Sequence, residues 1–121
     1  MENKKQGWEI YRDEKFAVIR GAISWDSANF LFNYLGVKRT VAKKLLSDDY
    51  ESELIGTFEE TDTDKSVYSI YGDMAIDTAM LKVKQQVNKL IGEQIYPTYS
   101  YARIYPYESI VAPHKDREEC E

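Results

Sequence analysis

Histidine and cysteine are nearly absent from this chain of 121 residues, which holds one of each, His114 and Cys120. A single cysteine cannot form an intrachain disulfide. The count also excludes zinc sites built from four cysteines or from two cysteines and two histidines. A chain with so little cysteine fits a reducing compartment. Glycine (6 residues) and proline (3 residues) are scarce, the composition is ordinary for a globular protein, and the sequence holds no low-complexity tract.

Long hydrophobic runs and an excess of positive charge are lacking as well. No apolar run approaches the ~18 residues of a membrane span, and the N-terminus has no apolar segment of the secretory type. The formal net charge is -5, which disfavours unaided binding to nucleic acid or to an anionic membrane. We therefore expect a cytoplasmic protein without nucleic-acid or membrane partners. The length predicts a single domain over residues 1–121.

The first third of the chain predicts a hairpin followed by helices. Two short β-prone runs, residues 8–11 and 16–19, flank a charged tetrapeptide and favour a hairpin. Ser24 then offers an N-cap oxygen for a helix, and Gly36 occupies a position typical of a helix-terminating glycine. A second amphipathic stretch follows Gly36.

Residues 47–64 contain many carboxylates and no lysine or arginine. Such a composition is typical of a solvated connection, so we predict an acidic loop over residues 47–65. The eight carboxylates are Asp48, Asp49, Glu51, Glu53, Glu59, Glu60, Asp62 and Asp64.

The clearest periodic segment is residues 73–91. Residues 66–71 alternate as a strand does, and the helical pattern begins directly after them. An apolar stripe predicts a helix that packs against a sheet, with Gly92 as its terminator. The stripe consists of Ile76, Met80, Val83, Val87 and Leu90.

Residues 98–105 show strict β alternation, which Pro106 ends. One face carries Ser100, Ala102 and Ile104, and the other is amphipathic. The amphipathic face is apolar enough to bury, yet it offers hydroxyl and guanidinium donors to a carboxylate. A half-buried strand that uses tyrosine for packing would give the same pattern, so both interpretations stay open. The residues of the amphipathic face are Tyr99, Tyr101, Arg103 and Tyr105.

His114-Lys115-Asp116 is the motif with the clearest chemistry. In an extended segment, side chains two residues apart lie on the same side of the backbone. An imidazole and a carboxylate so placed are two-thirds of the 2-His-1-carboxylate set that binds non-haem Fe(II). The alternative is a surface histidine among charged neighbours, and the motif alone does not decide between the two.

The run Tyr99-Ser100-Tyr101-Ala102-Arg103-Ile104-Tyr105-Pro106, followed by Ala112-Pro113-His114-Lys115-Asp116-Arg117, resembles the Fe(II)/2-oxoglutarate-dependent dioxygenases. More narrowly, it is similar to their prolyl 4-hydroxylase-like branch, including its small bacterial and phage-type members. The resemblance is specific over about residues 96–121 and only architectural over residues 8–92.

The resemblance implies an α+β fold in which N-terminal helices pack on the first strands of a double-stranded β-helix (jelly-roll) core, incomplete in this chain. It implies that His114 and Asp116 are iron ligands. Tyr105, nine residues before His114, would bind 2-oxoglutarate, and Tyr101 and Arg103 could line the same pocket. The reaction would be oxidative hydroxylation of a small-molecule or peptidyl substrate.

The family's second histidine and its 2-oxoglutarate-anchoring basic residue lie on later core strands, which are not in this sequence. We therefore expect a fragment of a longer oxygenase, whose activity on its own is not assumed. Two alternatives to a fragment stay open. The chain could be one piece of a split enzyme, complemented by a C-terminal chain. It could instead be a catalytically inactive interaction protein, with self-association through an exposed strand edge.

Overall fold

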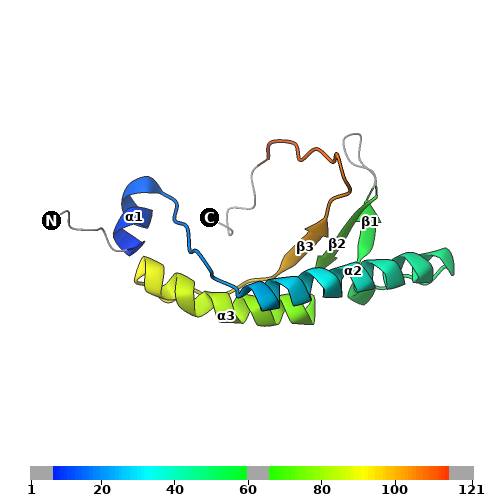
Figure 1. Cartoon of the computed structure of the whole chain (residues 1–121), viewed down its shortest axis with the longest axis horizontal. Coiled ribbons are helices and arrows are strands. Elements are labelled where there is room, and N and C mark those ends of the chain that lie inside the picture. The colour runs from blue at the N-terminus through cyan, green and yellow to red at the C-terminus, as the bar shows by residue number, and fades with distance from the viewer. Residues whose placement is uncertain (1–6, 60–65, 115–121) are drawn as a thin grey trace.

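A computed structural model describes residues 7–59 and 66–114 of the chain, and in this part the fold is α+β (Figure 1). Figure 1 shows α2 and α3 along one side of the molecule, with the sheet on the other side. The described elements are helices α1 (Gly7–Glu14), α2 (Trp25–Ser47) and α3 (Met74–Ile91), the 3-10 turn η1 (Glu53–Ile55), and strands β1 (Thr57–Glu59), β2 (Val67–Tyr71) and β3 (Tyr101–Ile104).

The sheet is antiparallel throughout, in the order β1-β2-β3. Tyr68 pairs with Phe58 on one side and with Ile104 on the other, so these three side chains share one face of the sheet. That face packs against α2. The core cluster consists of Ala42, Tyr68 and Ile70, with Leu35, Ile55, Phe58, Ala102 and Ile104 partly buried around it.

The predicted strand with tyrosines forms, although it is shorter than the alternating pattern. Ser100 is buried, and Ala102 and Ile104 pack on the core, as the alternation predicts. Regular pairing is confined to Tyr101–Ile104, because β3 pairs only with the short strand β2. The opposite face is therefore left to the tyrosines and Arg103.

The helix predicted over residues 73–91 is confirmed. Asp73 caps its N-terminus by accepting hydrogen bonds from the amides of Ala75 and Ile76, and Gly92 ends it in the left-handed conformation at φ 73°. The helix contacts α1, and its apolar stripe and residues 95–99 line a common hollow. The sequence predicted that this stripe packs against a sheet, whereas the hollow that it lines is shared with the segment that precedes β3.

Two local predictions are wrong. Residues 7–14 form helix α1 instead of the first strand of a hairpin, because contact with α3 outweighs a weak local β preference. Gly36 does not end a helix, and α2 continues through it to Ser47. A glycine inside a helix costs only about 1 kcal/mol, which a long helix with a packed face tolerates.

The predicted acidic loop is partly regular structure. Ser47 ends α2, residues 53–55 form η1, and residues 57–59 form an edge strand whose Phe58 packs on the core. The rest of the predicted loop, residues 60–65, lies outside the described residues. Scattered apolar residues among the carboxylates, Ile55 and Phe58, are the reason that this segment folds back onto the sheet.

The described helices differ from membrane-spanning helices. None of them combines the length and the hydrophobicity that crossing a bilayer requires.

Candidate functional site

The sheet face turned away from α2 carries the polar and aromatic residues that the sequence singled out, and we call it the open face. The strand register brings Thr57, Ser69 and Arg103 into one row across the three strands. Tyr71 and Tyr101 pair in the neighbouring row. Side chains on the same face of paired strands lie within contact distance, so the sheet gathers groups from three distant segments.

Arg103 is the charged centre of the open face. Its Nη1 donates a 3.2 Å hydrogen bond to the Tyr105 hydroxyl, and its Nη2 lies 3.2 Å from a Glu59 carboxylate oxygen. The guanidinium carbon is 5.1 Å from the Tyr105 ring centroid and 6.0 Å from that of Tyr101, both within cation–π range. The three residues predicted to bind a co-substrate are therefore neighbours.

Two buried polar atoms of the open face lack a hydrogen-bond partner in the part of the chain that the structure describes. They are the Ser69 hydroxyl and the Arg103 Nε. Ser69 is only 3% exposed. Leaving such a group unsatisfied costs about 1–3 kcal/mol, so a pair of them on one face points to a ligand with polar atoms of its own.

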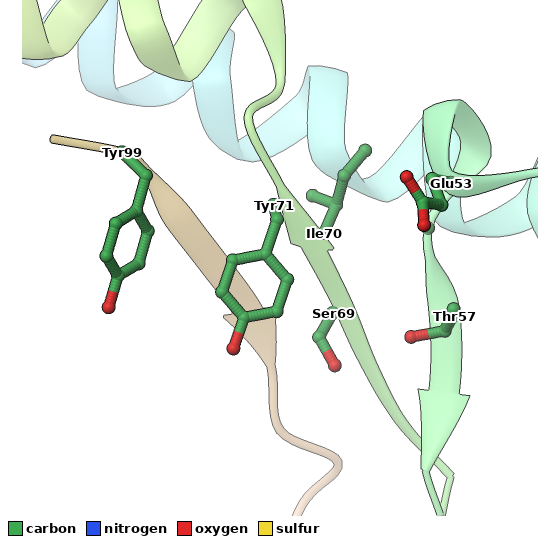
Figure 2. A pocket seen from close by; sticks show the side chains of 7 residues that line it. Glu53, Thr57, Ser69, Ile70, Tyr71 and Tyr99 are labelled. Carbon is green, nitrogen blue, oxygen red and sulfur yellow. The ribbon is translucent and has the colours of Figure 1, made fainter. Parts of the chain in front are cut away.

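The tyrosines form a continuous aromatic surface next to this pair. Tyr71 stacks on Tyr101, with ring centroids 4.1 Å apart, and meets Tyr99 at 5.8 Å in a tilted arrangement. Tyr71 and Tyr99 also line an open hollow of about 510 Å³ beside Ser69 (Figure 2). The open face therefore combines flat apolar walls with a few directed polar groups, as ligand sites do.

The metal-binding half of the predicted site is only partly described. His114 is exposed, and its Nδ1 lies 2.9 Å from the Ala112 carbonyl oxygen. A carbonyl oxygen only accepts, so Nδ1 is the donor in this contact. Asp116 lies outside the described residues. Among residues 7–59 and 66–114, no cluster of three or more His, Cys, Asp or Glu side chains could hold a metal ion.

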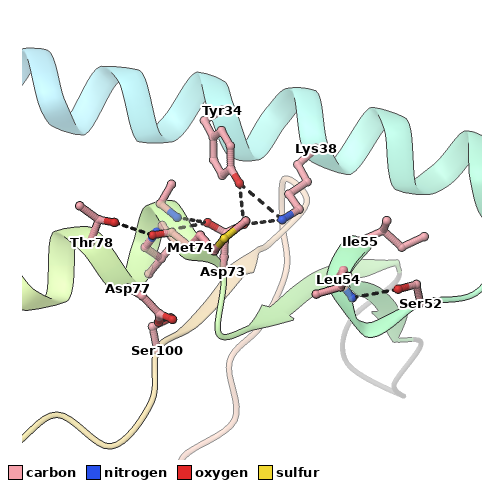
Figure 3. A network of polar contacts seen from close by, with 12 residues as sticks. Tyr34, Lys38, Ser52, Leu54, Ile55, Asp73, Met74, Asp77, Thr78 and Ser100 are labelled. Atoms are coloured by element: carbon pink, nitrogen blue, oxygen red, sulfur yellow. Dashed lines mark hydrogen bonds and ion pairs between the residues drawn. The ribbon is translucent and has the colours of Figure 1, made fainter.

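A second polar cluster joins α2 to the start of α3 (Figure 3). Oδ2 of Asp73, whose side chain is fully buried, accepts a 2.7 Å hydrogen bond from the Tyr34 hydroxyl and forms an ion pair with Lys38. Oδ1 caps α3. One carboxylate thus satisfies donors from two helices. We assign this cluster a structural role.

The ionisable groups of that cluster shift one another's pKa values. Burial acts to raise the pKa of Asp73, but hydrogen bonds from Lys38 and Tyr34 outweigh it, and the pKa lies below its ordinary value. Burial acts to lower the pKa of Lys38, yet its bonds to Asp73 and Tyr34 raise it overall. Donation to Asp73 raises the pKa of the Tyr34 hydroxyl. The ion pair is therefore the stable form over the neutral range.

Sequence reasoning missed the partners that strand pairing supplies. Ser69 and Tyr71 belong to a strand that was predicted, but their side of the sheet depends on a register that the sequence does not reveal. Glu59 and Glu53 were assigned to a solvated loop. A signal was present in the spacing of Ile55 and Phe58, two apolar residues that could anchor the segment.

Comparison with models of protein families, with curated proteins and with solved structures found no match to this chain.

Proposed function

We propose that the open face is the co-substrate surface of an Fe(II)/2-oxoglutarate-dependent hydroxylase, on the first strands of a jelly-roll core. The observation that supports this most is Arg103, held between two tyrosines with an unpartnered buried Nε. A guanidinium with a free N–H beside hydroxyl groups is a strong receptor for a carboxylate. 2-Oxoglutarate presents two carboxylates and a ketone, which match these donors.

The chain's own groups have separate tasks in this proposal. Arg103 would bind a carboxylate through Nε, while Tyr105 and Ser69 would supply further hydrogen bonds to it. The stacked rings of Tyr71 and Tyr101 would exclude water from one side. Glu59 opposes this role, since its ion pair neutralises Arg103 and competes with a ligand carboxylate.

His114 would be the imidazole ligand: the Ala112 carbonyl would orient the ring through Nδ1, and Nε2 would be the coordinating atom. Asp116 would be the carboxylate ligand. The 121 residues contain one histidine, so the second imidazole of the set is not among them. Bound Fe(II) would supply the oxidising chemistry with O2, and the open face would bind and orient the co-substrate.

The co-substrate surface is tested by titrating 2-oxoglutarate into the full chain and following backbone amide NMR shifts. We expect saturable shifts at Ser69, Tyr101 and Tyr105 that are lost in Arg103→Gln. Arg20→Gln is the matched control, because Arg20 is an exposed arginine outside the open face. Unchanged binding in Arg103→Gln, or shifts spread away from the open face, would overturn the proposal.

The metal half is tested separately with Mn(II), a paramagnetic ion that shares the oxygen and nitrogen ligands of Fe(II). We expect selective line broadening of amides near His114 at low Mn(II) concentration, abolished in His114→Gln. Broadening that centres on residues 47–59 and survives in His114→Gln would show only binding to the acidic segment.

A second candidate function is a non-catalytic binding protein, favoured by the exposed apolar side chains of α2. Four large apolar side chains there are between 65% and 76% exposed, an unusual density for one helix of a monomer. They are Trp25, Phe30, Phe32 and Val37. This candidate predicts concentration-dependent self-association in sedimentation velocity, abolished by Trp25→Ser combined with Phe32→Ser. A monomer at all concentrations would contradict self-association.

A further inference from the structure

The hollow on the open face has a charge character different from that of Arg103. It is lined by one carboxylate, three hydroxyl-bearing side chains of β1 and β2, a further tyrosine and two residues without polar side chains, and by no lysine or arginine. Figure 2 shows the Glu53 carboxylate and the Thr57 hydroxyl on one side of the hollow and Tyr71 and Tyr99 on the other. The lining residues are Glu53, Gly56, Thr57, Ser69, Ile70, Tyr71 and Tyr99.

Glu53 is the first residue of η1, and the backbone of this turn is held in place by its neighbours. Ser52 caps η1 by accepting from the Leu54 amide at 3.2 Å. The hydroxyl of the fully buried Tyr68 donates a 2.7 Å bond to the Ile55 carbonyl at the end of the turn. Gly56 follows at φ 88°, so close to Tyr68 that a Cβ atom there would lie 2.5 Å from the ring. The turn that carries the carboxylate is thus clamped to the core.

The Glu53 carboxylate has no ion-pair partner among the lysines and arginines in residues 7–59 and 66–114. An exposed carboxylate on a clamped turn, across the hollow from two tyrosines and without a cation of its own, attracts a positive ligand.

The aromatic wall suits a cation. Tyr71 uses one ring face to stack on Tyr101, yet the residue is 60% exposed, so much of its surface is open to a ligand. Tyrosine faces attract ammonium groups with about 0.5–2 kcal/mol, and pairs of rings with a nearby carboxylate are a recurrent way to bind alkylammonium ions.

The buried Ser69 hydroxyl provides an independent indication of a ligand. Ser69 lines the hollow and is only 3% exposed. Its Oγ has no hydrogen-bond partner among the described residues. A hydroxyl oxygen accepts a hydrogen bond, and an ammonium group has N–H groups to donate. An amine in the hollow would therefore satisfy a buried hydroxyl that no described residue satisfies.

From these contacts we infer that the hollow binds the ammonium group of an alkylamine, of the kind carried by a lysine side chain or a small aliphatic amine. Glu53 supplies the charge, Tyr71 and Tyr99 supply the aromatic walls, and Ser69 accepts a hydrogen bond. Binding of the amine does not depend on the proposed function. The further step, that the amine is part of the substrate to be hydroxylated, rests on the proposed function.

The test uses n-butylammonium as the probe and n-butanol as its neutral counterpart, titrated into the full chain without metal or 2-oxoglutarate. We expect saturable amide shifts at Thr57, Ser69 and Tyr71 with the amine and none with the alcohol. Glu53→Gln should weaken binding about fivefold or more, because it removes the charge and keeps the size. Equal shifts with the alcohol, or unchanged affinity in Glu53→Gln, would overturn the inference.

Four further variants separate the possible causes. Glu51→Gln removes the same charge from the same segment but not from the hollow, and it should leave the affinity within about twofold of the unmodified chain. Tyr71→Phe should retain binding and Tyr71→Leu should lose it, since the ring face and not the hydroxyl makes the contact.

Arg103→Gln should retain amine binding, so loss of 2-oxoglutarate binding and loss of amine binding report on different proposals.

Discussion

The hydroxyl of Tyr34, on α2, donates a 2.7 Å hydrogen bond to Oδ2 of Asp73, the residue that caps α3. Lys38, one helical turn beyond Tyr34, reaches the same oxygen. The carboxylate is fully buried, so its charge has to be balanced locally. This contact fixes the start of α3, and with it the Gly72 corner that follows β2, against the helix that covers the sheet.

Replacing Asp73 by Asn should destabilise the fold by about 2 kcal/mol. Asparagine caps a helix about as well as aspartate, so the substitution removes the charge and retains the cap. Lys38 then loses its counterion in a partly buried position. Urea unfolding measures the loss, and Asp26→Asn, which alters an exposed carboxylate in the first turn of α2, is the matched control. Equal midpoints for the two variants would show that the ion pair contributes nothing.

The same pair predicts how stability depends on pH. The pKa of Asp73 is lowered from 3.8, so the ionised group stabilises the fold fully above that value and the contribution disappears as the pH falls through and below it. The pKa of Lys38 is raised from 10.5, so its contribution is complete below that value and is lost only at higher pH. The gap in unfolding free energy between the unmodified chain and Asp73→Asn should therefore be flat near neutrality and narrow in acid. A gap that persists unchanged below pH 3.8 would contradict the assignment.

Gly56 and Gly72 form a matched pair for testing the clamp on η1. Both have positive φ, 88° and 63°, but a Cβ atom at Gly56 would meet the Tyr68 ring, while one at Gly72 would meet nothing within 4 Å. Gly72→Ala should cost about 1 kcal/mol from backbone strain alone. Gly56→Ala should cost about 2 kcal/mol more, because Tyr68 is fully buried and cannot move aside without loss of packing. Thermal unfolding of the two variants compares them, and equal losses would show that the approach to Tyr68 is not tight.

Periodicity in the sequence was enough to predict α3, β2 and the two faces of β3. The pattern is long in α3 and strict in β3, and in β3 the packing follows it: Ala102 and Ile104 pack on the core cluster, and Arg103 does not. The pattern failed where local preference is weak. Residues 7–14 become helical through contact with α3, which no local property of the segment reveals.

The candidate site was predictable only in part, for a related physical reason. Tyr101 and Arg103 lie on β3, and Tyr105 follows it directly, so alternation alone places them together. Their partners come from β1 and β2, and a shift of one residue in register would turn Ser69 to the core and Tyr68 to the open face. Register is set by packing of Phe58 and Tyr68, which is a tertiary effect.

Removing the charge of Glu59 should strengthen binding of a carboxylate ligand to the open face. Glu59 lies 3.2 Å from Arg103 Nη2 and is half exposed, so the ion pair itself contributes little to stability. A ligand carboxylate has to share the guanidinium with it, at the cost of like-charge repulsion. In Glu59→Gln we expect succinate, a dicarboxylate without the ketone, to bind about three- to tenfold more tightly, with unfolding midpoints nearly unchanged. The same titration with Glu108→Gln, an exposed carboxylate after β3, controls for net charge. Weaker succinate binding in Glu59→Gln would mean that Glu59 orients Arg103 for the ligand and does not compete with it.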